Sequence, residues 1–175
     1  QKIPQVVIEQ STSDPPEIVG STFAADVMKR EKRLIFIMRE CASSYTTAHI
    51  IEDGRAVTRS TAVIQSCIEL RPSDGPFAVV RTDPAPGFQA LVNDKTLHFH
   101  CISTELGRFK NANKNPFAER AVQEVREHIL KIDPTAHAVS SLVLSLAVAS
   151  VNGTICQCGL SAREILTQRN QFNNR

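Results

Sequence analysis

The sequence has no tryptophan, a single tyrosine and eight phenylalanines among its 175 residues. Because aromatic side chains are so few, aliphatic ones have to fill the core, and the chain is long enough to bury a substantial core within one domain. An excess of charge of one sign is also lacking, since 20 basic and 18 acidic side chains give a formal net charge of +2. The overall charge therefore does not indicate a nucleic-acid-binding protein.

Long apolar runs, a signal peptide and a disulfide framework are missing as well. The longest apolar segment, AVSSLVLSLAVASV (138–151), is too short and too rich in serine to span a bilayer, and no stretch resembles a signal peptide. The five cysteines are an odd number and lie mostly in apolar segments, which favours reduced, buried thiols. Cys156 and Cys158 have no second pair at zinc-site spacing, so we expect them to be buried too. These features predict an intracellular protein that does not associate with membranes.

The apolar patterns predict an α/β fold. Residues 1–20 are polar and contain prolines, so we expect an extended arm or linker before a domain over 21–175. Apolar and β-branched segments predict strands over 21–28, 33–40, 45–51, 77–82 and 96–102. Helical spacing and end signals predict helices over 55–70, 87–94, 116–132, 135–151 and 161–169, with a polar loop over 103–115. The order β-β-β-α-β-α-β-α-α indicates a mixed five-stranded sheet flanked by helices, with a parallel crossover before the fourth strand.

Three carboxylates occupy unusual places on these elements. Asp26 lies inside the first strand, and Asp83 directly follows the fourth strand. Glu119 lies in the first turn of the helix over 116–132, one position past the site where it would form a capping box with Asn115. If the first and fourth strands are neighbours, the two aspartates lie together and repel each other unless a cation lies between them. Three such oxygen donors are typical ligands of Mg²⁺ or Mn²⁺.

Each acid also has an ordinary explanation. A strand aspartate is common at an exposed sheet edge, and Asp83 precedes a proline, as turn aspartates often do. Glu119 on its own is typical of a helix surface. An α/β domain with unrelated surface acids would place Asp26 far from Glu119.

The spacing of the acids favours a shared site. Thirty-five residues separate Asp83 from Glu119, and an earlier aspartate lies in a strand. This arrangement resembles the D,D-35-E pattern of retroviral and LTR-retrotransposon integrases. The segments FAADVM, VVRTDPAPGF and NKNPFAERAVQEV resemble the first catalytic strand, the second catalytic strand end and the catalytic helix of that family, and LSAREILTQRNQF resembles its closing motif. Over about 21–170 the chain is similar to the catalytic core of a gypsy-like integrase, which implies a ribonuclease H-like fold.

The resemblance implies a polynucleotidyl transferase that processes 3′ ends and inserts retroelement DNA into host DNA in the nucleus. Asp26, Asp83 and Glu119 would be its catalytic residues and would hold two Mg²⁺ or Mn²⁺ ions per active site. Phosphoryl transfer of this kind needs no serine or cysteine nucleophile, and none is evident. The partners implied are the terminal DNA of the element, target DNA, and further copies of the chain in a homodimer or higher oligomer.

Basic and polar residues near Glu119 are candidates for DNA contacts. Gln123 and Arg126 lie on the same stripe of the helix and would face the viral-end DNA of the family. Arg108, Lys110 and Lys114 would lie in the neighbouring loop. For Arg126, an intrahelical ion pair with an acid such as Glu119 or Glu127 is an equal alternative. His98 and His100 have no sequence partner for metal binding, so we expect surface or packing roles on the strand over 96–102.

Two other functions remain open. A ribonuclease H-like nuclease commonly adds a carboxylate from the first helix, but residues 55–68 contain no acid and Glu69 comes only at the end of that helix. A domesticated or inactive integrase could act as a DNA-binding or interaction module. The intact set of three acids favours an active enzyme. The zinc-binding and C-terminal modules that usually accompany such cores are not recognised in this sequence.

Overall fold

The computed structural model describes residues 18–73, 75–107, 115–135, 138–173 and 175. Its strands are β1 (Thr22–Arg30), β2 (Arg33–Glu40), β3 (Thr46–Ile51), β4 (Ala78–Thr82) and β5 (Ile102–Leu106). Its helices are α1 (Ala56–Leu70), α2 (Pro86–Gln89), α3 (Lys95–Phe99), α4 (Pro116–Ile132), α5 (Ser141–Gly153) and α6 (Ala162–Thr167). Within these described ranges, no helix is long and apolar enough to cross a membrane.

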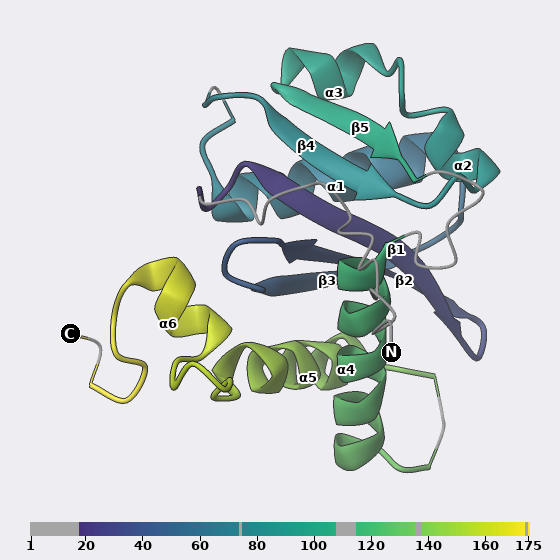
Figure 1. Cartoon of the computed structure of the whole chain (residues 1–175). Helices are drawn as coiled ribbons and strands as arrows, with labels where there is room; N and C mark the ends of the chain where they lie inside the picture. The colour runs from purple at the N-terminus through teal and green to yellow at the C-terminus, as the bar shows by residue number, and fades with distance from the viewer. Residues whose placement is uncertain (1–17, 74, 108–114, 136–137, 174) are drawn as a thin grey trace, which may run out of the picture.

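The strands form one mixed sheet in the order β3-β2-β1-β4-β5 (Figure 1). Short turns connect β1, β2 and β3, which are therefore antiparallel neighbours. α1 crosses over between β3 and β4, so that β4 lies parallel to β1, and β5 lies parallel to β4. The predicted mixed five-stranded sheet, its antiparallel meander and its parallel crossover are confirmed.

Helices cover both faces of the sheet. Successive side chains of a strand point to opposite faces, so Phe36 and Met38 of β2 join a core under α1, while Ile35 and Ile37 join a core under α4 and α5. In Figure 1, α4 and α5 cross each other on one face and α1 lies on the other. Phenylalanines fill only part of these cores, and aliphatic side chains fill the rest, as the composition predicts.

The prediction of a strand over 96–102 is wrong. Asp94 accepts hydrogen bonds from the backbone N–H groups of Thr96 and Leu97, and this cap starts the short helix α3 instead. The fifth strand begins only after Cys101, whose φ of 58° turns the chain. The polar loop predicted over 103–115 is consequently wrong at its start, because residues 103–106 belong to β5.

Three related predictions also change. His98 lies in α3 and His100 caps its C-terminus, so neither projects from a strand. The helix predicted over 87–94 is confined to the single turn α2. The helix predicted from residue 135 starts at Ser141, because the Ser140 hydroxyl accepts a hydrogen bond from the N–H of Val143 and caps the helix there.

Candidate active site

The two aspartates lie side by side on neighbouring inner strands of the sheet, β1 and β4. Ala25 of β1 pairs with Thr82 of β4 in parallel register, so the next residues along both strands are Asp26 and Asp83. Both side chains are half-buried. The Asp26 Oδ1 atom accepts a hydrogen bond of 2.7 Å from the N–H of Val27. The expectation that these two residues lie on neighbouring strands is therefore confirmed.

The charge of Glu119 also affects the pKa of Asp26. Burial raises the pKa of the Asp26 carboxyl above its usual value, while the hydrogen bond from Val27 lowers it. The neighbouring carboxylate of Asp83 raises this pKa further, and that of Glu119 does so to a smaller extent. The carboxylate of Glu119 is thus near enough to Asp26 for the two charges to interact. The catalytic and metal-binding roles of the three residues stay predictions.

Asn115 positions the helix that bears Glu119. It is the N-cap residue of α4, as predicted, but its side chain makes no capping hydrogen bond. The buried side-chain amide instead donates to the carbonyl oxygens of Ala25, at 3.4 Å, and Arg81, at 3.1 Å. These two carbonyls belong to β1 and β4, next to the aspartates. Asn115 therefore ties the start of α4 to β1 and β4, beside the two aspartates, a role that the capping pattern did not predict.

A cation would find suitable donors among these carboxylates. The buried Oδ1 atom of Asp83 has no hydrogen-bond partner in the segments that the structure describes, and an unpaired buried acceptor is costly unless a ligand satisfies it. All three candidate side chains offer hard oxygen atoms, which Mg²⁺ and Mn²⁺ prefer. Among the described residues, however, no three acidic, histidine or cysteine side chains converge closely enough to form a metal site. Mutual repulsion of like charges favours such a spread arrangement.

Arg59 is a cation near Asp26 that the sequence patterns did not predict. It lies in the first turn of α1, is half-buried, and lowers the pKa of Asp26 through its positive charge. The only sequence signal was a basic residue shortly after Gly54, at the start of the crossover helix. That signal is weak, because a basic residue at a helix start is usually solvated.

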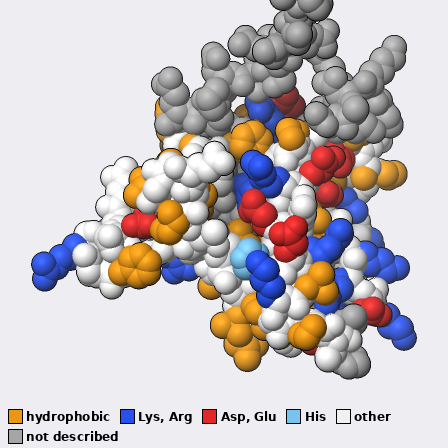
Figure 2. All heavy atoms as spheres, turned by 60° about the horizontal axis from the view of Figure 1, so that its bottom comes forward, with side chains coloured by type: hydrophobic (Ala, Val, Ile, Leu, Met, Phe, Trp, Pro, Cys, Tyr) orange, Lys and Arg blue, Asp and Glu red, His pale blue; other side chains and the backbone are white. Residues whose placement is uncertain are grey.

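The predicted DNA-contacting residues differ in how they are placed. Gln123 and Arg126 are exposed on α4, and the Gln123 amide donates to Glu127 at 3.0 Å. Within the described part of the chain, Arg126 forms no ion pair, so the proposed pairing with Glu119 or Glu127 is not observed. Arg108, Lys110 and Lys114 lie outside the described residues. Figure 2 shows acidic and basic side chains intermixed on the face that it presents.

The five cysteines differ in burial, and Cys101 is half-buried. Cys41 and Cys67 are buried, as expected, and burial raises the pKa of Cys41 to about 11 and that of Cys67 to about 12. The expectation that Cys156 and Cys158 are buried is wrong, since both are exposed. They lie in a tight turn that the N–H of Cys156 closes on the carbonyl of Leu160, at 2.9 Å. This turn lies between α5 and α6, where residues 154–160 are all exposed.

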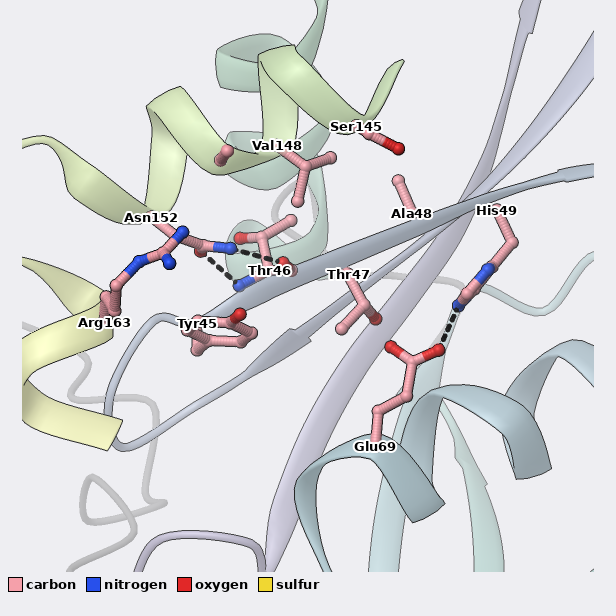
Figure 3. A pocket seen from close by; sticks show the side chains of 11 residues that line it. Tyr45, Thr46, Thr47, Ala48, His49, Glu69, Ser145, Val148, Asn152 and Arg163 are labelled. Atoms are coloured by element: carbon pink, nitrogen blue, oxygen red, sulfur yellow. Dashed lines mark hydrogen bonds and ion pairs between the residues drawn. The ribbon is translucent and has the colours of Figure 1, made fainter. Parts of the chain in front are cut away.

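A separate cleft of about 310 Å³ follows the free edge of β3. Its walls come from β3, α5, the end of α1 and Arg163 of α6 (Figure 3). The Asn152 amide exchanges two hydrogen bonds of 2.8 Å with the backbone of Thr46. At the other end, His49 Nε2 lies 3.2 Å from Glu69 Oε1. Asn152 therefore takes the place of a neighbouring strand at this edge.

Replacing Asn152 with leucine is expected to lower the free energy of unfolding by about 2 kcal/mol. The change leaves the buried N–H and carbonyl groups of Thr46 without partners, and each such group costs about 1–3 kcal/mol. Urea unfolding followed by circular dichroism measures the loss, with Ser150→Ala on the exposed side of α5 as the matched control. Equal stability of the two variants would show that Asn152 does not hold the edge.

Comparisons with known proteins agree on the fold. No family model matches the sequence, and no curated protein matches it. The catalytic core domain of BIV integrase superimposes with a TM-score of 0.68 and 19% identity, covering 85% of this chain and 95% of that one. A chain of the simian T-cell lymphotropic virus intasome, solved in complex with PP2A regulatory subunit B56 gamma, gives a TM-score of 0.73 and 13% identity. That match covers 90% of this chain but only 58% of the other. The chain therefore has the ribonuclease H-like fold of retroviral integrase catalytic cores.

Proposed function

We propose that this chain is the catalytic core of a retroelement integrase, of the gypsy-like LTR-retrotransposon type. It would process the 3′ ends of the element's DNA and transfer them to host DNA, which implies action in the nucleus. The observation that supports this function is the placement of Asp26, inside β1, beside Asp83, directly after the end of the neighbouring strand β4, with the charge of Glu119 acting on Asp26. The fold shared with integrase cores and the 35-residue spacing between the second and third acids agree with it.

The three carboxylates would hold two divalent metal ions, Mg²⁺ or Mn²⁺. When bound, such ions activate a water or a 3′-hydroxyl for attack and stabilise the leaving oxygen of a phosphodiester. The chain's own contribution is positioning. Asp26 and Asp83 are fixed by parallel strands, Asn115 fixes the start of α4, and the unpaired Oδ1 of Asp83 would gain a partner. Phosphoryl transfer depends mainly on such positioning and on charge neutralisation.

DNA would reach the site along the exposed stripe of α4. Gln123 and Arg126 follow Glu119 on that stripe, and both are exposed to solvent. A guanidinium without an intrahelical partner is available for a phosphate or a base edge. Arg108, Lys110 and Lys114, which precede α4 in the sequence, are proposed to add phosphate contacts.

The active form is proposed to be a homodimer or a higher oligomer. Leu142 and Leu146 of α5 are 68% and 49% exposed, and the small residues Ser145 and Ala149 beside them are exposed too. This face borders the cleft along β3. An apolar face of this kind is expected to be covered by another copy of the chain.

The nuclease alternative receives no support from α1. It would need an acid of α1 beside the aspartates, but Glu69 lies at the end of that helix in the β3 cleft, paired with His49 (Figure 3). The other alternative, a domesticated or inactive integrase that acts as a binding module, differs from the proposed function only in lacking enzymatic activity. The activity assay below therefore tests it as well.

The proposed function is tested by a disintegration assay, in which a branched DNA is resealed in the presence of Mn²⁺ or Mg²⁺. This assay suits a catalytic core because it needs little recognition of the DNA end. We expect metal-dependent resealing by the wild type and a loss of at least about 100-fold in Glu119→Gln, because one of the three charged donors is removed.

The matched control is Glu127→Gln, which removes an exposed carboxylate two turns further along α4 and should keep the wild-type rate. Equal rates for wild type and Glu119→Gln would contradict the assignment of the three acids. Absence of resealing by the wild type would contradict an enzymatic function for this chain.

A further inference from the structure

The guanidinium of Arg59 is held in place on two sides. Its Nε–H donates to the carbonyl of Gly54 at 3.0 Å, and its Cζ atom lies 4.3 Å from the ring centroid of Phe88. Phe88 is itself only 1% exposed, so the ring is a fixed surface. An arginine stacked on an aromatic ring and bonded at one edge has little freedom to move.

Gly87 allows this packing. A Cβ atom at position 87 would lie 2.6 Å from Nε and 2.7 Å from Cζ of Arg59, and 2.8 Å from the carbonyl oxygen of Gly54. No side chain fits there without displacing backbone or guanidinium. Because residues 84–88 follow Asp83 directly, the turn that leaves the catalytic strand is built against Arg59.

The remaining donors of Arg59 have no hydrogen-bond partner in the part of the chain that the structure describes. In the described ranges, its Nη1 and Nη2 atoms make no hydrogen bond and no ion pair. Arg59 is nevertheless close enough to Asp26 for the two charges to interact. A half-buried guanidinium with a fixed plane and free terminal nitrogens is preorganised to bind a phosphate through two hydrogen bonds.

We propose that Arg59 is a substrate-binding residue that contacts a non-bridging phosphate oxygen of DNA at or next to the reacting phosphodiester. This inference rests on the proposed function and deepens it. Arg59 provides a permanent positive charge near the carboxylate of Asp26, at a point where the negatively charged DNA backbone would have to approach the proposed site. A purely structural role, in which Arg59 only holds the turn over 84–88, is the competing explanation.

A double-mutant cycle between protein and DNA separates the two roles. In this experiment, binding of the full chain to a branched DNA is measured in Ca²⁺. The measurement is repeated with a set of DNAs that are identical except that each has a different single phosphate replaced by an uncharged methylphosphonate. For Arg59→Met we expect binding to weaken by about 10-fold to 100-fold, as for the loss of a charge-assisted hydrogen bond. The dependence of log Kd on log salt should also fall by about one unit of slope.

The decisive result is whether the effect of a methylphosphonate on binding depends on the presence of Arg59. One methylphosphonate near the branch point should weaken binding by the wild type and have no further effect on Arg59→Met. Arg55→Met is the matched control, because Arg55 lies at the start of the same helix but is exposed and paired with Asp53 at 2.8 Å. It should retain the full methylphosphonate penalty.

Several outcomes would overturn the inference. A structural role would leave every methylphosphonate penalty and the salt slope unchanged in a folded Arg59→Met. If Arg59→Met does not fold, the same scan is made with Arg59→Lys, for which a smaller penalty at one phosphate supports the contact and an unchanged profile contradicts it. Failure of the wild type both to bind and to reseal the branched DNA would overturn the proposed function as well. Binding and resealing without coupling would overturn only the role of Arg59.

Discussion

Replacing Asp26 with asparagine is expected to reduce metal-dependent disintegration by about 10³-fold or more and, at the same time, to stabilise the metal-free chain. Asp26 is central among the three carboxylates, because its charge interacts with both Asp83 and Glu119. Losing it should therefore weaken the binding of both proposed metal ions, and metal ions contribute several kcal/mol to reactions of the proposed kind. Burial and the two neighbouring acids make the ionised Asp26 costly in the folded state, so we expect a gain of about 1 kcal/mol in the free energy of unfolding.

The pH dependence provides a check on this stabilisation. Because the pKa of Asp26 in the folded chain is raised above its unfolded value, ionised Asp26 destabilises the fold at neutral pH. This penalty disappears as the pH falls through the raised pKa, so the stability difference between wild type and Asp26→Asn should vanish at acid pH. Urea unfolding in EDTA at several pH values measures it.

The matched control for Asp26→Asn is Asp94→Asn. Asparagine caps helices as well as aspartate does, so this variant should keep both activity and stability. An Asp26→Asn chain that retains resealing activity would contradict the site, and one that is less stable at neutral pH would contradict the electrostatic argument.

Replacing Glu124 with alanine is expected to lower the free energy of unfolding by about 3 kcal/mol. Glu124 on α4 pairs with Arg39 of β2, whose side chain is only 3% exposed and also donates to the Thr46 hydroxyl at 3.0 Å. Removing one partner of such a pair leaves a buried charge uncompensated, at a cost of about 3–5 kcal/mol. The lower value applies because the side chain of Glu124 is 37% exposed.

The same pair links α4 to the sheet, so its loss should also displace Glu119. Urea unfolding measures the stability of Glu124→Ala, and the double variant Arg39→Met, Glu124→Leu should recover much of the loss, since apolar replacement of a buried pair is often neutral. Arg120→Ala is the control, because Arg120 is 77% exposed and lies 4.0 Å from Glu124. If Arg120→Ala lowers the free energy of unfolding as much as Glu124→Ala does, the stabilisation comes from the exposed pair of Arg120 and Glu124 and not from the buried pair with Arg39.

Local competition explains where prediction from the sequence failed. The segment over 96–102 alternates apolar and polar residues as a strand does, but the Asp94 cap forms a helix from its first half. Likewise, Ser140 starts α5 later than the apolar pattern suggests. In both cases one side-chain hydrogen bond to the backbone outweighed a weak periodic signal. Long elements such as α1 and α4 tolerate such competition, and their limits agreed closely with prediction.

The sequence by itself determined the sheet, the parallel crossover and the acids, because these depend on apolar periodicity and on distances along the chain. Only the tertiary structure decided what Asn115 and Arg59 do. The Asn115 amide bonds to Ala25 and Arg81, which lie 90 and 34 residues away in sequence, and Arg59 lies between Asp26 and the turn at Gly87. Such contacts follow from strand pairing and helix packing in space, and no local pattern specifies them.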